Sequence, residues 1–220
     1  MKSATIALIL LNIAIFILSP FGLNAQTFVD DYGFSTNSAL AKPWTWVTSL
    51  FIHASLLHIL YNMLGLLFFG KNLEHEIGSQ KFLLVYIIGG FAANLASILV
   101  LPSEIVSVGA SGAVFAVIGA AILIKPFGFT MFPFVIPLPL GIVGIIYAMS
   151  ATILFFTEPI VAINHAAHFG GLIFGMGYGI NREGIKKGAA IIAFFLLVIV
   201  LSELFLLPIL QDFLARALKT

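Results

Sequence analysis

The chain has 220 residues, of which 61% are hydrophobic and only 9% are charged, and its formal net charge at pH 7 is +1. A soluble globular domain carries about 25% charged residues, so this composition indicates an integral membrane protein. The low net charge excludes a strongly basic nucleic-acid-binding surface, and the absence of cysteine excludes disulfides, thiolate metal sites and cysteine nucleophiles.

Apolar stretches long enough to cross a bilayer follow one another along the chain. A spanning helix needs roughly 20 apolar residues. The sequence predicts an all-α, polytopic membrane helix bundle of about seven segments, over residues 4–22, 55–73, 80–101, 111–124, 132–156, 160–181 and 188–210. The first stretch, with Lys2 before it and Ala25 after it, also fits a signal peptide with a poor cleavage site.

The first loop, about 23–52, changes character along its length. It is polar at its start, with Asp30 and Asp31, and becomes amphipathic through Trp44 and Trp46. Aromatic side chains of this kind favour the boundary between membrane and water. We therefore expect the loop to lie on or in the outer leaflet, with a plain aqueous loop as the alternative.

Basic residues predict the orientation of the segments. If the N-terminus lies in the cytoplasm, seven of the ten basic residues lie on the cytoplasmic side and three on the outer side. This division agrees with the excess of positive charge on the cytoplasmic side of membrane proteins. The cytoplasmic group is Lys2, Lys71, Lys81, Lys125, Arg182, Lys186 and Lys187, and the outer group is Lys42, Arg216 and Lys219.

Three polar residues lie at one predicted depth. Each of His58, Ser111 and His168 is followed 13 or 14 residues later by a basic residue expected at the cytoplasmic edge. At 1.5 Å per residue this interval is about 20 Å of helix, so all three lie about 10 Å below the outer surface. Polar residues inside membrane segments are costly and often functional.

The fourth segment is too short to span a bilayer by itself, because residues 111–124 give a helix of only about 21 Å. The preceding stretch, 102–109, must therefore re-enter the membrane before the helix begins. Irregular backbone at that depth is tolerated only where protein buries it or water reaches it. Water at Ser111 is what a hydrolytic reaction requires.

Ser111 lies in the sequence Gly109-Ala110-Ser111-Gly112, at the predicted start of that helix. Unpaired backbone N–H groups and the positive end of the helix dipole favour a developing oxyanion there. Gly109 permits backbone conformations that a larger residue could not adopt. A serine that only caps the helix is the alternative interpretation.

His168 is predicted to lie beside Ser111. Glycines at spacing four follow it at 171, 175 and 179, and the fourth segment carries a matching stripe of small residues at 112, 116 and 120. Such stripes let two helices approach closely. A neutral imidazole beside Ser111 could accept the serine proton and later deliver it to a leaving amine.

Other polar residues near Ser111 and His168 could assist the reaction, or could indicate a different base or a metal site. His58 and Asn62 share one helix face and can donate hydrogen bonds to an oxyanion, or can link helices. His165, one turn from His168, could compete with it or form a metal site with it, but no third ligand is apparent and we expect no metal or cofactor. No acidic residue lies at this level in the helices of Ser111 and His168, so a serine–histidine dyad is favoured over a triad.

Taken in order, these motifs resemble the rhomboid family of intramembrane serine proteases. The matching elements are His53-Ala-Ser-Leu-Leu-His58-Ile-Leu-Tyr-Asn62, Glu74-x-x-x-Gly78-Ser79, Gly109-Ala110-Ser111-Gly112 and Ala167-His168-x-x-Gly171-x-x-x-Gly175. They extend over about residues 44–180, and four such motifs in sequence with suitable gaps are specific.

The resemblance implies a six-helix catalytic core, here 1–187, followed by an additional C-terminal helix and tail, 188–220. It implies Ser111 as nucleophile and His168 as general base, with His58, Asn62 and backbone N–H groups at Gly109 to Ser111 stabilising the oxyanion. Its substrates would be transmembrane proteins cut near their outer membrane boundary. We expect the chain in the lipid bilayer of the plasma membrane, its active site open to the outside.

Two positions depart from the family pattern. Trp44 is followed by Thr45 where the family often has arginine, and Phe115 stands where it often has tyrosine. Phe115 can still stack on His168, but it has no hydroxyl group. Two other functions compete with a protease, namely an inactive rhomboid-like protein that binds membrane clients and an unrelated transporter, although a transporter should show repeat symmetry. The sequence leaves the physiological substrate, the gating element, the role of Glu203 and the oligomeric state open.

Overall fold

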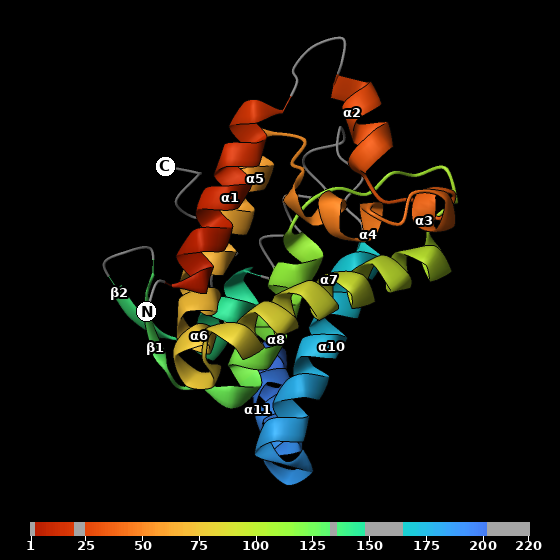
Figure 1. The fold of residues 1–220 in the computed structure, drawn as a ribbon. Coiled ribbons are helices and arrows are strands. Elements are labelled where there is room, and N and C mark those ends of the chain that lie inside the picture. The colour runs from red at the N-terminus through yellow and green to blue at the C-terminus, as the bar shows by residue number, and fades with distance from the viewer. Residues whose placement is uncertain (1–2, 20–24, 133–135, 148–164, 202–220) are drawn as a thin grey trace, which may run out of the picture.

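A computed structural model of the chain describes residues 3–19, 25–132, 136–147 and 165–201. Helices dominate this part of the chain, and the predicted membrane helix bundle is confirmed (Figure 1). The long helices are α1 (Ala4–Leu18), α5 (Leu56–Gly65), α7 (Ser79–Val100), α8 (Ser111–Ile124), α10 (His165–Glu183) and α11 (Ile185–Leu201). Two continuous helical stretches, Leu56–Ile77 and Ser79–Val100, are long and apolar enough to cross a membrane, and Ala4–Leu18 and Ser111–Ile124 are shorter apolar helices.

The second segment is longer than predicted, because it continues beyond residue 73 to Ile77. It consists of α5, a π-helical turn η3 (Leu66–Gly70) and α6 (Lys71–Ile77). A π turn accommodates one residue more than an α turn and often occurs near functional sites. The turn lies between His58 near the start of the segment and Glu74 near its end.

The first loop is folded onto the bundle as four short elements. These are α2 (Ala25–Tyr32), α3 (Ser38–Ala41), α4 (Thr45–Thr48) and the 3₁₀ turn η2 (Ser49–Phe51). Phe34 is only 1% exposed, and its backbone exchanges two hydrogen bonds with Ser107 in the stretch before α8. Trp46 stacks on Phe91 of α7 at 5.7 Å between ring centroids. The loop therefore holds the stretch before α8 in place.

The predicted helix over 132–156 is wrong at its start. Residues Phe129–Phe132 (β1) and Ile136–Pro139 (β2) form an antiparallel hairpin, and helix begins only at Leu140 and is described to Tyr147. The sequence carries prolines at 133, 137 and 139, and proline in a helix interior removes a hydrogen bond and clashes with the preceding turn. Residues 148–156, like residues 160–164 of the sixth predicted segment, lie outside the described ranges.

Helix α8 forms the centre of the bundle, between α7 and α10. Twelve of its residues are buried, whereas Ser111 at its start is only partly covered. Gly89 of α7 and Gly112 of α8 let these two helices touch, because a Cβ atom on either glycine would overlap the Cβ of Ala116 or Ala93. This close packing fixes the position of Ser111 relative to the neighbouring helices.

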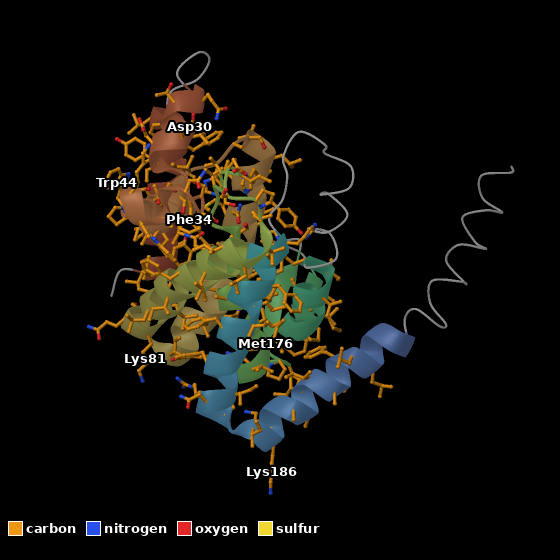
Figure 2. All side chains as sticks on the ribbon, turned by 90° about the vertical axis from the view of Figure 1, so that its right-hand side faces the viewer. Asp30, Phe34, Trp44, Lys81, Met176 and Lys186 are labelled. Atoms are coloured by element: carbon orange, nitrogen blue, oxygen red, sulfur yellow. The ribbon has the colours of Figure 1, made fainter. Side chains whose placement is uncertain are left out.

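The two ends of the bundle differ in charge. Figure 2 shows Lys81 and Lys186 at one end and Asp30 and Trp44 at the other, with α11 leaving the bundle at the basic end. At this end Lys125 binds Glu76 at 2.5 Å. The end opposite carries Lys42, which pairs with Asp31 at 2.8 Å. This arrangement agrees with the division of basic residues predicted from the sequence.

Candidate active site

Ser111 and His168 lie side by side. Ser111 is the first residue of α8, and its Oγ lies 2.8 Å from Nε2 of His168 on α10. The His168 ring stacks on Phe115 of α8, with 4.4 Å between centroids and planes only 11° apart. The stack and the hydrogen bond together fix the imidazole orientation, so Nε2 faces the hydroxyl group. Among the described residues no carboxylate lies within ion-pair distance of His168.

The two stripes of small residues predicted from the sequence do meet. Cβ atoms added at Gly171 and Gly175 would overlap the backbone carbonyl oxygens of Gly112 and Ala116. A Cβ at Gly179 would lie 2.6 Å from the Leu123 side chain. Helices α8 and α10 are therefore in backbone contact, and this contact brings His168 to Ser111.

Gly109 occupies a conformation that glycine favours, because its φ angle is +123°. It also lies against the His58 ring, since a Cβ atom on Gly109 would be 2.6 Å from Nε2 of His58. Its own N–H donates to the Ser49 carbonyl oxygen at 2.9 Å, which ties the stretch before α8 to the first loop. The structure thus brings the His58 ring to the backbone two residues before Ser111.

Asn62 lies one turn beyond His58 and is 1% exposed. Its Nδ2 donates to the His58 carbonyl oxygen at 2.9 Å, within α5. Asn62 Oδ1 and His58 Nδ1 are buried atoms without a hydrogen-bond partner among the described residues. Unsatisfied buried polar atoms are rare, and a bound molecule or water is one common explanation for them.

His53 has a specific position that sequence reasoning did not identify. Its Nε2 accepts a 3.4 Å hydrogen bond from the backbone N–H of Ala110, and its ring lies 5.1 Å from that of His58. The first histidine of the His53/His58 pair could have suggested such a role. The contact shows that His53 supports the residue immediately before Ser111.

His165 is exposed, and its ring lies 6.2 Å from the His168 ring in an edge-on arrangement. It therefore approaches the His168 ring edge-on. Within the described ranges there is no cluster of three or more residues that could hold a metal ion.

Glu74 supports the fold at the other end of the second segment. Its carboxylate accepts hydrogen bonds from the backbone N–H groups of Ala4 at 2.6 Å and Thr5 at 3.0 Å. The hydroxyl groups of Ser3 and Ser79 donate to the same carboxylate, each at 2.7 Å. An acidic group at a helix N-terminus is stabilised by the helix dipole, so Glu74 anchors α1 to the junction of α6 and α7.

Known proteins with similar sequences share one family. The rhomboid domain model matches residues 40–183. The chain is 31% identical over 169 residues to "Rhomboid protease GluP" of Bacillus subtilis, covering 76% of this chain and 31% of that protein. It is 34% identical over 87 residues to "Putative rhomboid protease YdcA" of the same species, covering 40% of this chain and 44% of that protein. A chloroplast relative, "Rhomboid-like protein 11" of Arabidopsis thaliana, is 45% identical over 82 residues, covering 37% of this chain and 29% of that protein.

These matches span less than half the length of the curated relatives. The family model nevertheless covers well over half of this chain and includes all of the motifs at His58, Ser111 and His168. Together with the helix bundle, the match shows that the chain belongs to the rhomboid family of membrane proteins.

Proposed function

We propose that this protein is an intramembrane serine endopeptidase that cleaves transmembrane proteins near the outer boundary of the membrane. Ser111 is the nucleophile and His168 is the general base. The observation that supports this assignment most directly is the 2.8 Å separation of Ser111 Oγ and His168 Nε2 at the N-terminus of a buried helix. Relatives that carry the name rhomboid protease support the same chemistry.

The reaction begins when Ser111 Oγ attacks the carbonyl carbon of the scissile peptide and gives its proton to His168 Nε2. His168 then donates this proton to the leaving amine, and the peptide C–N bond breaks. In the second half, His168 accepts a proton from water as the water oxygen attacks the carbonyl carbon of the acyl-enzyme ester. The ester bond to Ser111 then breaks as His168 returns the proton to Ser111 Oγ, which regenerates the dyad. The stacked Phe115 ring keeps the imidazole in position through both halves.

The negative charge on the tetrahedral intermediate needs donors prepared in advance. The N–H groups of Gly109 and Ala110 already donate to Ser49 and His53, so the Ser111 N–H at the start of α8, where the helix dipole favours an anion, is the backbone donor that we assign to this role. We assign the side-chain N–H donors to His58, whose ring lies against Gly109, and to Asn62, one turn farther along α5. Rotation of the Asn62 amide away from the His58 carbonyl oxygen would free Nδ2 for this purpose.

The expected substrates and location follow from the depth of the site. We infer that the N-terminus lies in the cytoplasm of a plasma-membrane protein and that the active site opens to the outside, which suits substrates with an unwound stretch at that level. We also infer a six-helix core over 1–187 and an appended helix over 188–220. Helix α11 already begins at Ile185, immediately after Gly184 with φ +90°.

The test uses the purified protein in detergent with a type I transmembrane substrate. Wild type should cleave it, Ser111→Ala and His168→Ala should each lose cleavage, and the matched variant His165→Ala should retain it. Cleavage that persists in Ser111→Ala would exclude the serine mechanism. If no substrate is cut, a fluorophosphonate probe separates the alternatives, because an active dyad labels at Ser111 and an inactive, client-binding relative does not.

A further inference from the structure

The hairpin of β1 and β2 lies at the basic end of the bundle, and it packs beside the helices instead of projecting past the basic residues. It begins four residues after Lys125, which binds Glu76 at 2.5 Å. Strand β1 packs against η3, whose residues Leu66–Gly70 immediately precede Lys71. The hairpin therefore lies within about two helical turns of Lys71 and Lys125. It is displaced from these lysines toward the apolar middle of the bundle, where η3 lies. Figure 1 shows it at the edge of the bundle, near α6 and the N-terminal end of α1.

Its two faces differ. Thr130 is 9% exposed, and Leu138, its partner in the ladder, packs against the main hydrophobic core. Phe129 on the opposite face is 66% exposed, and Pro137 on that same face is also exposed. One face is therefore fixed to the protein, and the other presents apolar side chains away from it.

The edge of β2 that faces away from β1 presents no backbone N–H groups, although a strand edge normally does. The N–H of Leu140 bonds to the Gly128 carbonyl oxygen, so the alternation of an antiparallel ladder turns the backbone groups of residues 137 and 139 away from β1. Both residues are proline and have no N–H group. Open sheet edges are avoided in hydrocarbon because each unsatisfied donor is costly, and prolines remove this cost.

From these three observations we propose that the hairpin is a re-entrant membrane anchor. It lies in the leaflet next to Lys71 and Lys125, with the face of Phe129 and Pro137 among lipid acyl chains. Leu10, which is 61% exposed on the apolar helix α1, serves as the reference for a lipid-facing position. This assignment is independent of the catalytic proposal and of which side of the membrane is the cytoplasm.

Because the chain has no cysteine, a single cysteine can carry a nitroxide spin label at any chosen position. Phe129→Cys, Leu10→Cys and Lys186→Cys, each in the full chain, are labelled and reconstituted in vesicles of phosphatidylcholine and phosphatidylglycerol. Power-saturation measurements give the accessibility of each label to oxygen, which concentrates in lipid, and to a polar nickel chelate, which stays in water. The ratio of oxygen to nickel accessibility at 129 should approach that at Leu10 and exceed that at Lys186 several-fold.

Two results would overturn the anchor. A ratio at 129 equal to that at Lys186 would place the hairpin in water, and low accessibility to both reagents would mean that protein covers it. Thr130→Cys is the matched control on the opposite face, and its label should be shielded from both reagents. Pro137→Cys reports on the same face as Phe129 and replaces Phe129→Cys if that variant does not fold.

Discussion

Two walls of the candidate site are built in different ways. On one side α8 and α10 meet through backbone atoms, because Gly171 and Gly175 leave no side chain between the helices. On the other side α5 meets the helix that begins at Leu140 through the rings of Tyr61 and Tyr147. These rings stack at 4.4 Å, and each hydroxyl donates to the other residue's carbonyl oxygen, at 2.7 Å and 3.1 Å.

The two walls differ in how well they tolerate substitution. Backbone contact between α8 and α10 cannot be lengthened without separating Ser111 from His168. The tyrosine contact depends on side-chain rotamers and hydrogen bonds, which can be exchanged at modest cost. We therefore expect substitutions in the first wall to abolish the site and substitutions in the second to weaken it in measurable steps.

The largest effect is expected at Gly171 and Gly175. Alanine at either position would overlap a backbone oxygen of α8, and we expect a loss of stability of more than about 3 kcal/mol together with loss of activity. Thermal unfolding in detergent and cleavage assays measure both. Gly177→Ala is the control on the same helix, because nothing lies within 4 Å of its Cβ position, and it should stabilise the protein by up to about 1 kcal/mol. Equal behaviour of all three variants would contradict backbone contact.

Comparing Gly109→Ala with Gly184→Ala should separate the effect of backbone strain from the effect of disturbing the catalytic site. The new methyl group would be held at a positive φ angle and would press on the His58 ring, and a displacement of about 1 Å here should reduce kcat roughly 100-fold. Gly184→Ala introduces the same kind of backbone strain, at φ +90°, with nothing within 4 Å. Only the first variant should lose activity, and a comparable loss in both would point to global destabilisation.

Tyr61→Phe and Tyr147→Phe each remove one hydrogen bond while keeping the stacked rings. Each should lower stability by about 1 kcal/mol, without abolishing activity. The double variant tests the reciprocity of the two bonds, because contacting residues are coupled and their losses should not simply add. Unchanged melting of both single variants would show that these bonds contribute nothing to the second wall.

The smallest effect is expected at the ion pair of Lys125 and Glu76, which lies outside both walls. Lys125→Met should cost no more than about 1 kcal/mol, and high salt should reduce the difference from wild type. Lys81→Met is a suitable control, because no ion pair of Lys81 occurs in the described part of the chain. A salt-independent loss at Lys125 would indicate a packing role for its aliphatic stem.

Much of the site could be predicted because it depends on local signals. The helix over Ser111–Ile124 was predicted with its observed bounds, since its length is limited by Gly109 before it and Lys125 after it. The spacing of small residues predicted which helices touch. The stacking of Phe115 on His168 was also predicted, from the resemblance to the family, and is confirmed.

The features that were missed depend on tertiary contacts or on competing local signals. The hairpin was taken as helix because hydrophobicity was given more weight than the prolines at 133, 137 and 139. The bond from Ala110 to His53 joins residues 57 positions apart, and no periodicity indicates it. The reciprocal tyrosine bonds are likewise set by how α5 approaches its neighbour, which residue spacing alone does not determine.

The π turn at Leu66–Gly70 determines how the two ends of the second segment are rotated relative to each other. Successive residues of an α-helix are rotated by about 100°. If the turn became regular α-helix at the same length, the face that carries Glu74 would rotate through about that angle relative to the face of His58 and Asn62. The carboxylate would then miss the N-terminus of α1, although every side chain in both motifs remained. The wide turn thus keeps the two halves of this segment in phase despite one extra residue, and a homologous segment that is one residue shorter here should be α-helical throughout.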